Sequence, residues 1–152
     1  IGYPDAASEA AILELARSRA KAGMVEAKAQ VRLLSQSQVF AARTEVLDMH
    51  LAPALEKYIV QLVLATRSPA TYDEQLARWI AFGASPRGTI ALDRCARAHA
   101  WLKQRDFVSP EDVHAVAADV LRHRVLLTYE AEAEGISSDQ VISRLLELIP
   151  LP

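Results

Sequence analysis

The sequence is poor in several residue types, and each shortage excludes a class of structure. It has one cysteine, Cys95, so no disulfide can form within the chain. Only 6% of its 152 residues are aromatic and 5 are glycines, whereas Ala, Leu, Glu, Arg and Gln, which favour helices, are abundant. No apolar run approaches the roughly 20 residues that a membrane-spanning helix requires. The composition therefore indicates a helical protein without a membrane span.

An excess of charge of one sign is also lacking. The 17 Lys and Arg residues are balanced by 19 Asp and Glu residues, for a formal net charge of −2 at pH 7. No global field attracts nucleic acid or an anionic membrane, so any contact with an anion must be local. Cys95 falls on the apolar side of a predicted helix, which favours a buried, inert thiol in a reducing cytoplasm. Because the chain begins at Ile1 without a Met or a signal-peptide pattern, we expect a piece of a longer protein.

Local start signals predict a series of helices joined by short connections. Pro stands at the first helical position of several of them, where its fixed φ and missing N–H are well suited. The predicted starts are Asp5 or Ser8, Ser37, Pro53, Ser85, Ser109, and Ser137 or Ser138, with a helix or irregular helical turn over 71–82. We expect a connector over 24–35, and residues 1–3 suit the end of a strand. The predicted fold class is all-α, a bundle of six or seven helices.

The spacing of apolar residues predicts which face of each helix is buried. For the first three helices the expected inward-facing residues are Ala11, Ile12, Leu15, Ala16, Val39, Phe40, Val46, Leu47, Leu55, Ile59, Leu62 and Val63. For the helix that runs from Ser85 to about Gln104 they are Ala91, Cys95, Ala98 and Leu102, with Arg94 and Arg97 facing outward. Residues 125–127 are either a continuation of the preceding helix or a short extended exit.

The candidate site is the stretch Gly83-Ala84-Ser85-Pro86-Arg87-Gly88, between two predicted helices. Ser85 is placed as the N-cap, Pro86 at the first helical position and Arg87 in the first turn. The unpaired N–H groups and positive dipole end of a helix start favour anions, and a guanidinium beside them matches the geometry of phosphate. We therefore interpret Gly83, Ser85, Pro86 and Arg87 as nucleotide-binding. The alternative is an ordinary helix start whose arginine pairs with a surface carboxylate.

Other candidate sites have weaker signals. Gly83 and Gly88 have the spacing of P-loop glycines, but Thr89 and Ile90 stand where Lys followed by Ser or Thr is needed. The four histidines have no Cys, His or Glu at metal-ligand spacing, so no metal site is predicted. Residues 122–124, Arg-His-Arg, form a basic cluster, but a helix C-terminus favours such residues without any phosphate or DNA to bind.

Taken in order, several segments resemble the C-terminal lid subdomain of MoxR-type AAA+ ATPases. The stretch Gly83-Ala84-Ser85-Pro86-Arg87 resembles the second-sensor motif of that family, and residues 106–113 look like the helix start that follows it. Further matches at the expected places are residues 1–5, 58–60, 65–67 and 124–126. The resemblance covers nearly the whole chain, with Gly88 in place of the usual Ala.

The resemblance implies that residues 1–35 are a linking segment and first helix that continue from an ATPase core, and that residues 36–152 form the helical lid. It implies that Arg87 is the second-sensor arginine, which reaches the γ-phosphate of ATP in its own or a neighbouring subunit. The Walker motifs, first sensor and arginine finger of the family would precede Ile1. ATP and Mg are therefore expected in the parent protein, and the fragment alone should not hydrolyse ATP.

Members of that family form ring oligomers, commonly hexamers. They act as chaperone-like ATPases that assemble or activate protein complexes, often with von Willebrand factor A domain partners. The resemblance therefore implies that the chain contacts an ATPase core and neighbouring subunits. No nucleic acid and no membrane is expected as a partner, because of the near-neutral net charge.

Two other classes of function remain open. A helix-turn-helix module would use residues 101–124, with Arg122 and Arg124 on DNA, but the net charge and the acidic start at Glu111 and Asp112 oppose it. A stand-alone helical adaptor would need an exposed apolar groove. Salt-dependent DNA binding would support the first class, and partner capture that is insensitive to substitution of Arg87 would support the second.

Overall fold

The computed structural model describes residues 4–21 and 33–152 of the chain. Internal contacts divide the chain into two units, Ile1–Ser35 and Gln36–Pro152, called here the N-terminal unit and the helical unit. The strand end expected at 1–3 and most of the connector expected over 24–35 lie outside the described residues, and 33–35 have no regular structure. No helix within the described ranges is long and apolar enough to cross a membrane.

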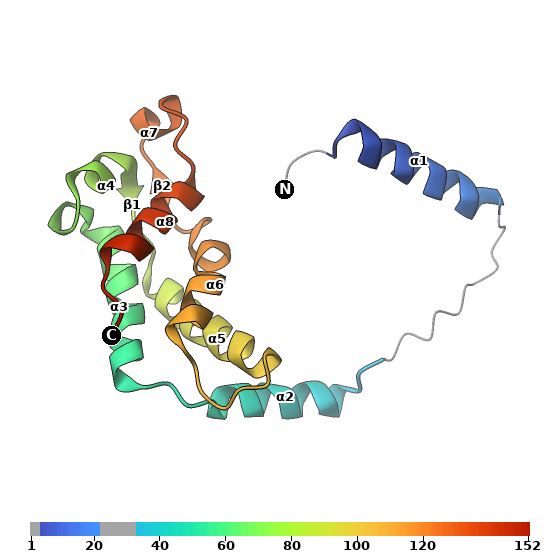
Figure 1. Cartoon of the computed structure of the whole chain (residues 1–152), viewed down its shortest axis with the longest axis horizontal. Coiled ribbons are helices and arrows are strands. Elements are labelled where there is room, and N and C mark those ends of the chain that lie inside the picture. The colour runs from blue at the N-terminus through green and yellow to red at the C-terminus, as the bar shows by residue number, and fades with distance from the viewer. Residues whose placement is uncertain (1–3, 22–32) are drawn as a thin grey trace. The chain divides into compact units, whose positions relative to one another are not determined.

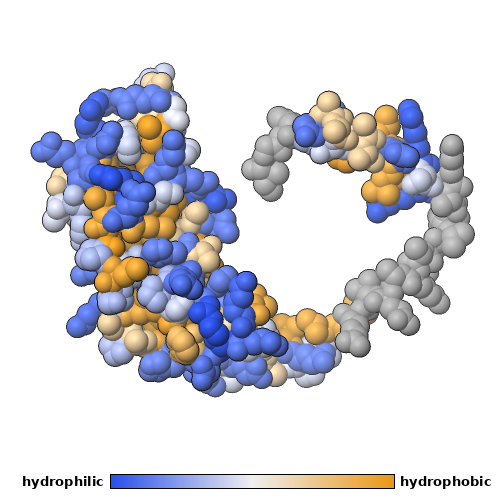
Figure 2. Space-filling view, in the orientation of Figure 1, coloured by the Kyte–Doolittle hydropathy of each residue, from blue (hydrophilic) through white to orange (hydrophobic). Residues whose placement is uncertain are grey.

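The described part of the N-terminal unit is one helix, α1 (Ala6–Lys21) (Figure 1). Its start is capped by Asp5, whose carboxylate accepts a 2.8 Å hydrogen bond from the main-chain N–H of Ser8. The face expected to be buried is exposed instead, and Ile12, Leu13 and Leu15 are at least half exposed. Figure 2 shows hydrophobic surface along this helix. The described residues of the N-terminal unit thus leave the apolar face of α1 uncovered.

Five longer helices within the described range 36–152 form the helical unit. They are α2 (Gln36–Asp48), α3 (Pro53–Arg67), α5 (Pro86–Leu102), α6 (Pro110–Leu121) and α8 (Ser138–Leu148). Pro occupies the first position of three of them, as predicted. At α6 the carboxylate of Asp112 accepts a 2.8 Å hydrogen bond from the N–H of Ser109, and at α8 Gln140 does the same for Ser137 at 2.7 Å. The starts of these longer helices were therefore predictable, because adjacent residues make them.

Smaller elements connect these helices. They are the 3₁₀ turn η1 (Pro69–Thr71), α4 (Glu74–Trp79), β1 (Ile80–Phe82), β2 (Leu126–Leu127) and α7 (Tyr129–Ala133). The two strands pair antiparallel, with Ile80 opposite Leu127 and Phe82 opposite Leu126. The prediction of helical structure throughout 71–82 is wrong at 80–82, and the exit after α6 is extended at β2. The strands, α4 and α7 gather at one end of the helical unit (Figure 1).

The all-α class is confirmed, although the described residues contain eight α-helices rather than six or seven. One reason for the different number is α7, which lies in the acidic run 130–134 and was not predicted. Thr128 begins this helix, because its hydroxyl accepts a 3.1 Å hydrogen bond from the N–H of Ala131. A helix of five residues has too few positions to show a 3.6-residue periodicity.

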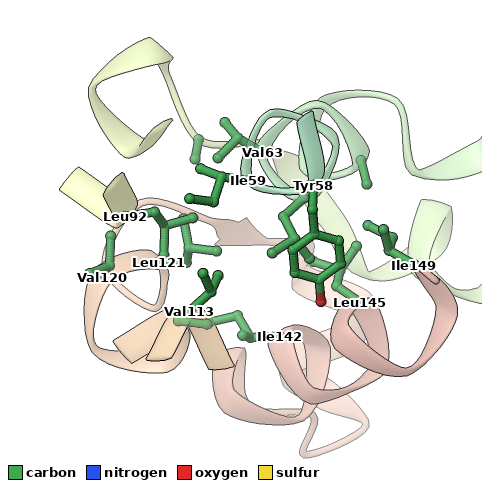
Figure 3. Close-up of a cluster of buried hydrophobic side chains, with 14 of the residues drawn as sticks. Tyr58, Ile59, Val63, Leu92, Val113, Val120, Leu121, Ile142, Leu145 and Ile149 are labelled. Atoms are coloured by element: carbon green, nitrogen blue, oxygen red, sulfur yellow. The ribbon is translucent and has the colours of Figure 1, made fainter. Parts of the chain in front are cut away.

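The core of the helical unit lies between α3, α5, α6 and α8 (Figure 3). Its largest side chains, each less than 2% exposed, are Tyr58, Ile59, Leu62, Leu76, Leu92, Leu121, Ile142, Leu145, Ile149, Val63, Val113 and Val141. The predicted inner face of α3 is confirmed. Tyr58 on the same helix is also fully buried, and its hydroxyl is satisfied by a 2.7 Å hydrogen bond with Nε2 of His114 on α6.

Helix α2 differs from its prediction, because it has no buried residue and the apolar residues Val39, Phe40 and Leu47 are exposed. Polar contacts attach its C-terminal end to α5. The indole N–H of Trp101 donates a 2.8 Å hydrogen bond to Glu45, and Arg97 donates to the main-chain carbonyl of Met49. The half-buried Arg97 also corrects the expectation that its side chain faces outward.

The buried face of α5 also differs from the prediction. The residues buried in this helix are Gly88, Leu92, Ala96 and Ala100, spaced four apart, and α6 and α3 pack against it. Cys95 is exposed, which overturns its interpretation as a buried thiol, and Leu102 is 70% exposed. Alanine is so frequent in α5 that its apolar periodicity does not distinguish adjacent faces. The choice is made by packing, because small residues let α6 approach closely.

Candidate functional site

The loop that leads into α5 lies directly against the C-terminal end of α3. At Gly83 the two backbones are so close that a Cβ atom would lie 2.3 Å from the carbonyl oxygen of Thr66 and 2.7 Å from the nitrogen of Arg67. No side chain fits there without displacing the backbone. The role of Gly83 is therefore to permit this close approach.

The next residue, Ala84, is held from both sides by α3. Its N–H donates a 2.9 Å hydrogen bond to the hydroxyl oxygen of Thr66, and its carbonyl accepts a 2.6 Å hydrogen bond from Nε of Arg67. The hydroxyl of Thr66 in turn donates to the carbonyl of Val63 at 2.6 Å. Thr66 and Ala84 are buried, so their polar groups have no access to water. The hydrogen bonds between them satisfy these groups instead.

Helix α5 begins where the sequence predicts. Ser85 occupies the N-cap position and Pro86 the first helical position. The side chain of Ser85, however, makes no capping hydrogen bond, and its main-chain carbonyl instead accepts a 2.7 Å hydrogen bond from the N–H of Gly88. Pro86 has no N–H and that of Gly88 is bonded, so the N–H in the first turn of α5 that has no bond within the described residues is that of Arg87, at the positive dipole end of the helix.

Arg87 projects from this first turn and is exposed. Within the described ranges, no hydrogen bond or ion pair joins its guanidinium to another residue. The alternative interpretation, a surface carboxylate paired with this arginine, therefore finds no support in the described residues. Arg67 and Arg124, which also lie beside the loop and the first turn of α5, both donate hydrogen bonds to main-chain carbonyls.

Residues at and just after the end of α6 flank the same turn. A Cβ atom on Gly88 would lie 3.7 Å from Cδ of Arg124 and 3.6 Å from a methyl group of Leu121. The guanidinium of Arg124 turns back to the carbonyl of Val120, and Arg122 pairs with Asp119 at 3.2 Å and Asp139 at 2.9 Å. These intramolecular contacts give no support to a DNA-binding role for the two arginines.

A second polar cluster surrounds Asp112, which is fully buried. Its carboxylate accepts hydrogen bonds from the N–H of Ser109 at 2.8 Å, from Nδ1 of His99 at 2.7 Å and from Arg105. Burial raises the pKa of this carboxyl, but the hydrogen bonds and the positive charge of Arg105 outweigh it, so the pKa lies below its ordinary value. The cluster joins α5 to α6 and serves structure.

Metal binding has no structural basis in the part of the chain that is described. No group of three or more His, Cys, Asp or Glu side chains there is arranged to hold an ion. The geometry around Arg87 instead suits an anion brought by another molecule, because an exposed guanidinium lies at the positive dipole end of α5.

Comparison with known proteins identifies the family. The AAA lid domain family matches residues 74–145, from the start of α4 into α8. The chain is 36% identical over 153 residues to the chaperone MoxR1 of Mycobacterium tuberculosis, covering 100% of this chain and 39% of that protein. It is 42% identical over 110 residues to the protein MoxR of Paracoccus denitrificans, covering 68% of this chain and 32% of that protein. A crystal structure of a candidate ATPase from Cytophaga hutchinsonii is similar with a TM-score of 0.84 and 42% identity, over 100% of this chain and 45% of that one.

The chain belongs to the lid region of the MoxR-type AAA+ ATPases. It spans less than half the length of the relatives it matches. Within this MoxR-type lid, the matched family region contains the loop and the whole of α5, so Arg87 lies on a lid helix.

Sequence reasoning missed the partners of the loop in this MoxR-type lid. Residues 65–67 were noted only as part of a family pattern, and no local signal connects Thr66 and Arg67 to a loop 17 residues further along the chain. The close packing of Gly83 was missed for the same reason. A small residue followed by Ala and Ser in a loop carries no information about which helix lies behind it.

Proposed function

We propose that this lid supplies Arg87 as the second-sensor arginine of a MoxR-type ATPase. In this proposal its guanidinium contacts the γ-phosphate of ATP held by the ATPase core, and the contact couples the nucleotide state to the orientation of the lid. The observation that carries the proposal is the position of Arg87, exposed in the first turn of α5 and without a side-chain partner among the described residues.

Physical chemistry favours a phosphate as the missing partner. The positive dipole end of α5 adds to the charge of the guanidinium, whose planar donors match phosphate oxygens. A charge-assisted hydrogen bond of this kind contributes roughly 1.5–3 kcal/mol. Gly83, Ser85 and Pro86 contribute indirectly, by holding the loop and starting the helix.

The parent protein supplies the rest of the site in this proposal. ATP and Mg bind the core, the core and lid belong to a ring oligomer, and the arginine serves its own nucleotide or that of a neighbouring subunit. Residues 1–35 link the lid to the core, which explains why Ile12, Leu13 and Leu15 on α1 lack a cover within the described residues. The cellular role is chaperone-like assembly or activation of protein complexes in the cytoplasm, with a von Willebrand factor A domain protein as a candidate partner.

The experiment compares the full-length parent with variants Arg87→Ala and Arg94→Ala. Arg94 is a matched control, because it is exposed on the same helix, carries the same charge and has no partner in the described part of the chain. ATP turnover, ATP affinity and thermal melting are measured for each protein. We expect Arg87→Ala to lower kcat roughly 10- to 100-fold without unfolding, and Arg94→Ala to behave as wild type.

Turnover that survives in Arg87→Ala would contradict the proposal. The motif would then be only a helix start, and partner capture unaffected by the substitution would favour an adaptor function instead. The isolated chain serves as a further control, and we expect it to hydrolyse no ATP.

A further inference from the structure

We propose that Thr66 and Arg67 are positioning residues that hold Arg87 in place for the phosphate, an inference that rests on the proposed function. Three contacts connect the end of α3 to the loop before Arg87. They are the close approach at Gly83 and the two hydrogen bonds to Ala84, one to its N–H and one to its carbonyl.

These contacts leave the loop little freedom. Both hydrogen-bonding groups of Ala84 are fixed to consecutive residues of α3, and the missing side chain of Gly83 lets the backbones touch. Pro86 then fixes φ two residues later, at the first position of α5. The position of the Arg87 backbone is therefore set by the end of α3.

The start of α5 differs in this respect from the starts of α6 and α8. Each of those helices has a local hydrogen bond between its cap residue and the third helical residue, Asp112 or Gln140. The side chain of Ser85 makes no such bond, and α5 has only the main-chain bond from the N–H of Gly88 to the carbonyl of Ser85. The contacts that hold the loop before it come from α3. A local cap would be enough to start a helix, whereas contacts from α3 set where its first turn lies relative to another element.

The same contacts couple Arg87 to α3. Because α3 and the loop before α5 are joined at three points, a force on Arg87 is transmitted to α3 rather than absorbed by the loop. Thr66 is central, since its one hydroxyl oxygen accepts from Ala84 while it donates to Val63. A shift of about 1 Å at a positioned group can reduce a rate about 100-fold.

The test uses the full-length parent with Thr66→Val, Thr66→Ser, Arg67→Ala and Arg87→Ala. Valine keeps the shape and burial of Thr66 but removes the hydroxyl, whereas serine keeps the hydroxyl. We expect kcat to fall about 10- to 100-fold in Thr66→Val and Arg67→Ala, with a smaller change in KM, and to be retained in Thr66→Ser. The double variant Thr66→Val with Arg87→Ala should turn over no more slowly than Arg87→Ala alone.

The outcomes distinguish the positioning role of Thr66 and Arg67 from the proposed function of Arg87. If Arg87→Ala is slow while Thr66→Val and Arg67→Ala match wild type, the positioning role is overturned and the proposed function stands. If Arg87→Ala is as fast as wild type, the proposed function itself falls. Equal losses in Thr66→Val and Thr66→Ser, or multiplied losses in the double variant, would also overturn the positioning role.

Folding is checked separately, so that a destabilised variant is not mistaken for a misplaced arginine. Thermal melting shows whether each variant is folded at the assay temperature. If Thr66→Val is not folded, Arg67→Ala decides the question, because Arg67 is an exposed residue and its loss removes no part of the core. Amide exchange at Ala84 in this chain should be slow in wild type and in Thr66→Ser, and fast in Thr66→Val.

Discussion

Nε of Arg67 donates a 2.6 Å hydrogen bond to the carbonyl oxygen of Ala84, 17 residues further along the chain. This bond joins the last residue of α3 to the loop that starts α5. The hydroxyl of Thr66 bonds the N–H of the same Ala84, so the end of α3 holds the loop that precedes Arg87, the charged side chain of the motif. The contribution of this junction to stability can be measured as the change in the free energy of unfolding of variants of this chain.

Gly83→Ala should destabilise the chain strongly. Its new Cβ would lie 2.3 Å from the carbonyl oxygen of Thr66, which is backbone and cannot turn away. We expect a loss of at least about 3 kcal/mol in the free energy of unfolding, measured by urea denaturation followed by circular dichroism. The same substitution at Gly88 is the matched control.

A Cβ on Gly88 would lie 3.1 Å from that of Ala84, a tight contact that small shifts can relieve. Alanine also favours helix over glycine by roughly 1 kcal/mol, which offsets the crowding. Gly88→Ala should therefore stay within about 1 kcal/mol of wild type. Equal midpoints for the two alanine variants would refute the close approach at Gly83.

Asp112 should control how steeply the free energy of unfolding declines at acid pH. Its folded-state pKa is lowered from the ordinary value of 3.8, so its contribution is present above that value and is lost as the pH falls through the folded-state pKa. Asp112→Asn should cost roughly 2–4 kcal/mol at pH 7, because Arg105 loses its buried anionic partner. It should also flatten the decline of unfolding free energy in acid.

The measurement is urea unfolding between pH 2 and pH 7, values that span the ordinary aspartate pKa. Glu111→Gln is the control, since this neighbouring carboxylate is exposed in the same helical turn. An acid limb that is identical in wild type and Asp112→Asn would show that other carboxylates set the acid sensitivity.

Tyr58 should influence how the free energy of unfolding declines at alkaline pH. Burial raises the pKa of its phenol above the ordinary value of 10.0, so the neutral form contributes stability below that value. This contribution is lost as the pH rises through the folded-state pKa. Tyr58→Phe removes the hydrogen bond to His114 and should cost about 1 kcal/mol at neutral pH, with a shallower loss of stability above pH 10.

Tyr129→Phe provides the comparison, because Tyr129 is 87% exposed. Its unfolding free energy should follow wild type at every pH. A Tyr58→Phe variant with the alkaline profile of wild type would mean that the buried phenol does not titrate with unfolding.

Local chemistry made much of this fold predictable. The starts of α3, α5 and α6 depend on a proline at the first helical position, and the start of α8 depends on Ser137 and Gln140. All these signals lie within four residues of the helix they begin. The inner face of α3 was also predictable, because its large residues Leu55, Ile59, Leu62 and Val63 leave one apolar stripe.

Contacts between residues far apart in the sequence were not predictable. The strand pair joins residues 80–82 to 126–127, and each strand is too short to show alternation. The apolar faces of α1 and α2 were expected to be buried, but they are exposed (Figure 2). Amphipathic periodicity shows that a helix face is apolar, and it does not show whether another element packs against that face. The place of Arg87 in the first turn of α5 was predictable because its signals lie in one short motif, whereas its role as a second sensor stays a prediction.

The sequence by itself determined where the longer helices begin, the all-α class, the MoxR-type lid family and the place of Arg87 in the first turn of α5. Only the tertiary structure decided which face of α5 is buried, that Cys95 is exposed, and that Thr66 and Arg67 hold the loop. The physical reason is the range of the interactions. Caps and proline act on adjacent residues, whereas burial and loop anchoring depend on which distant helix packs against the chain.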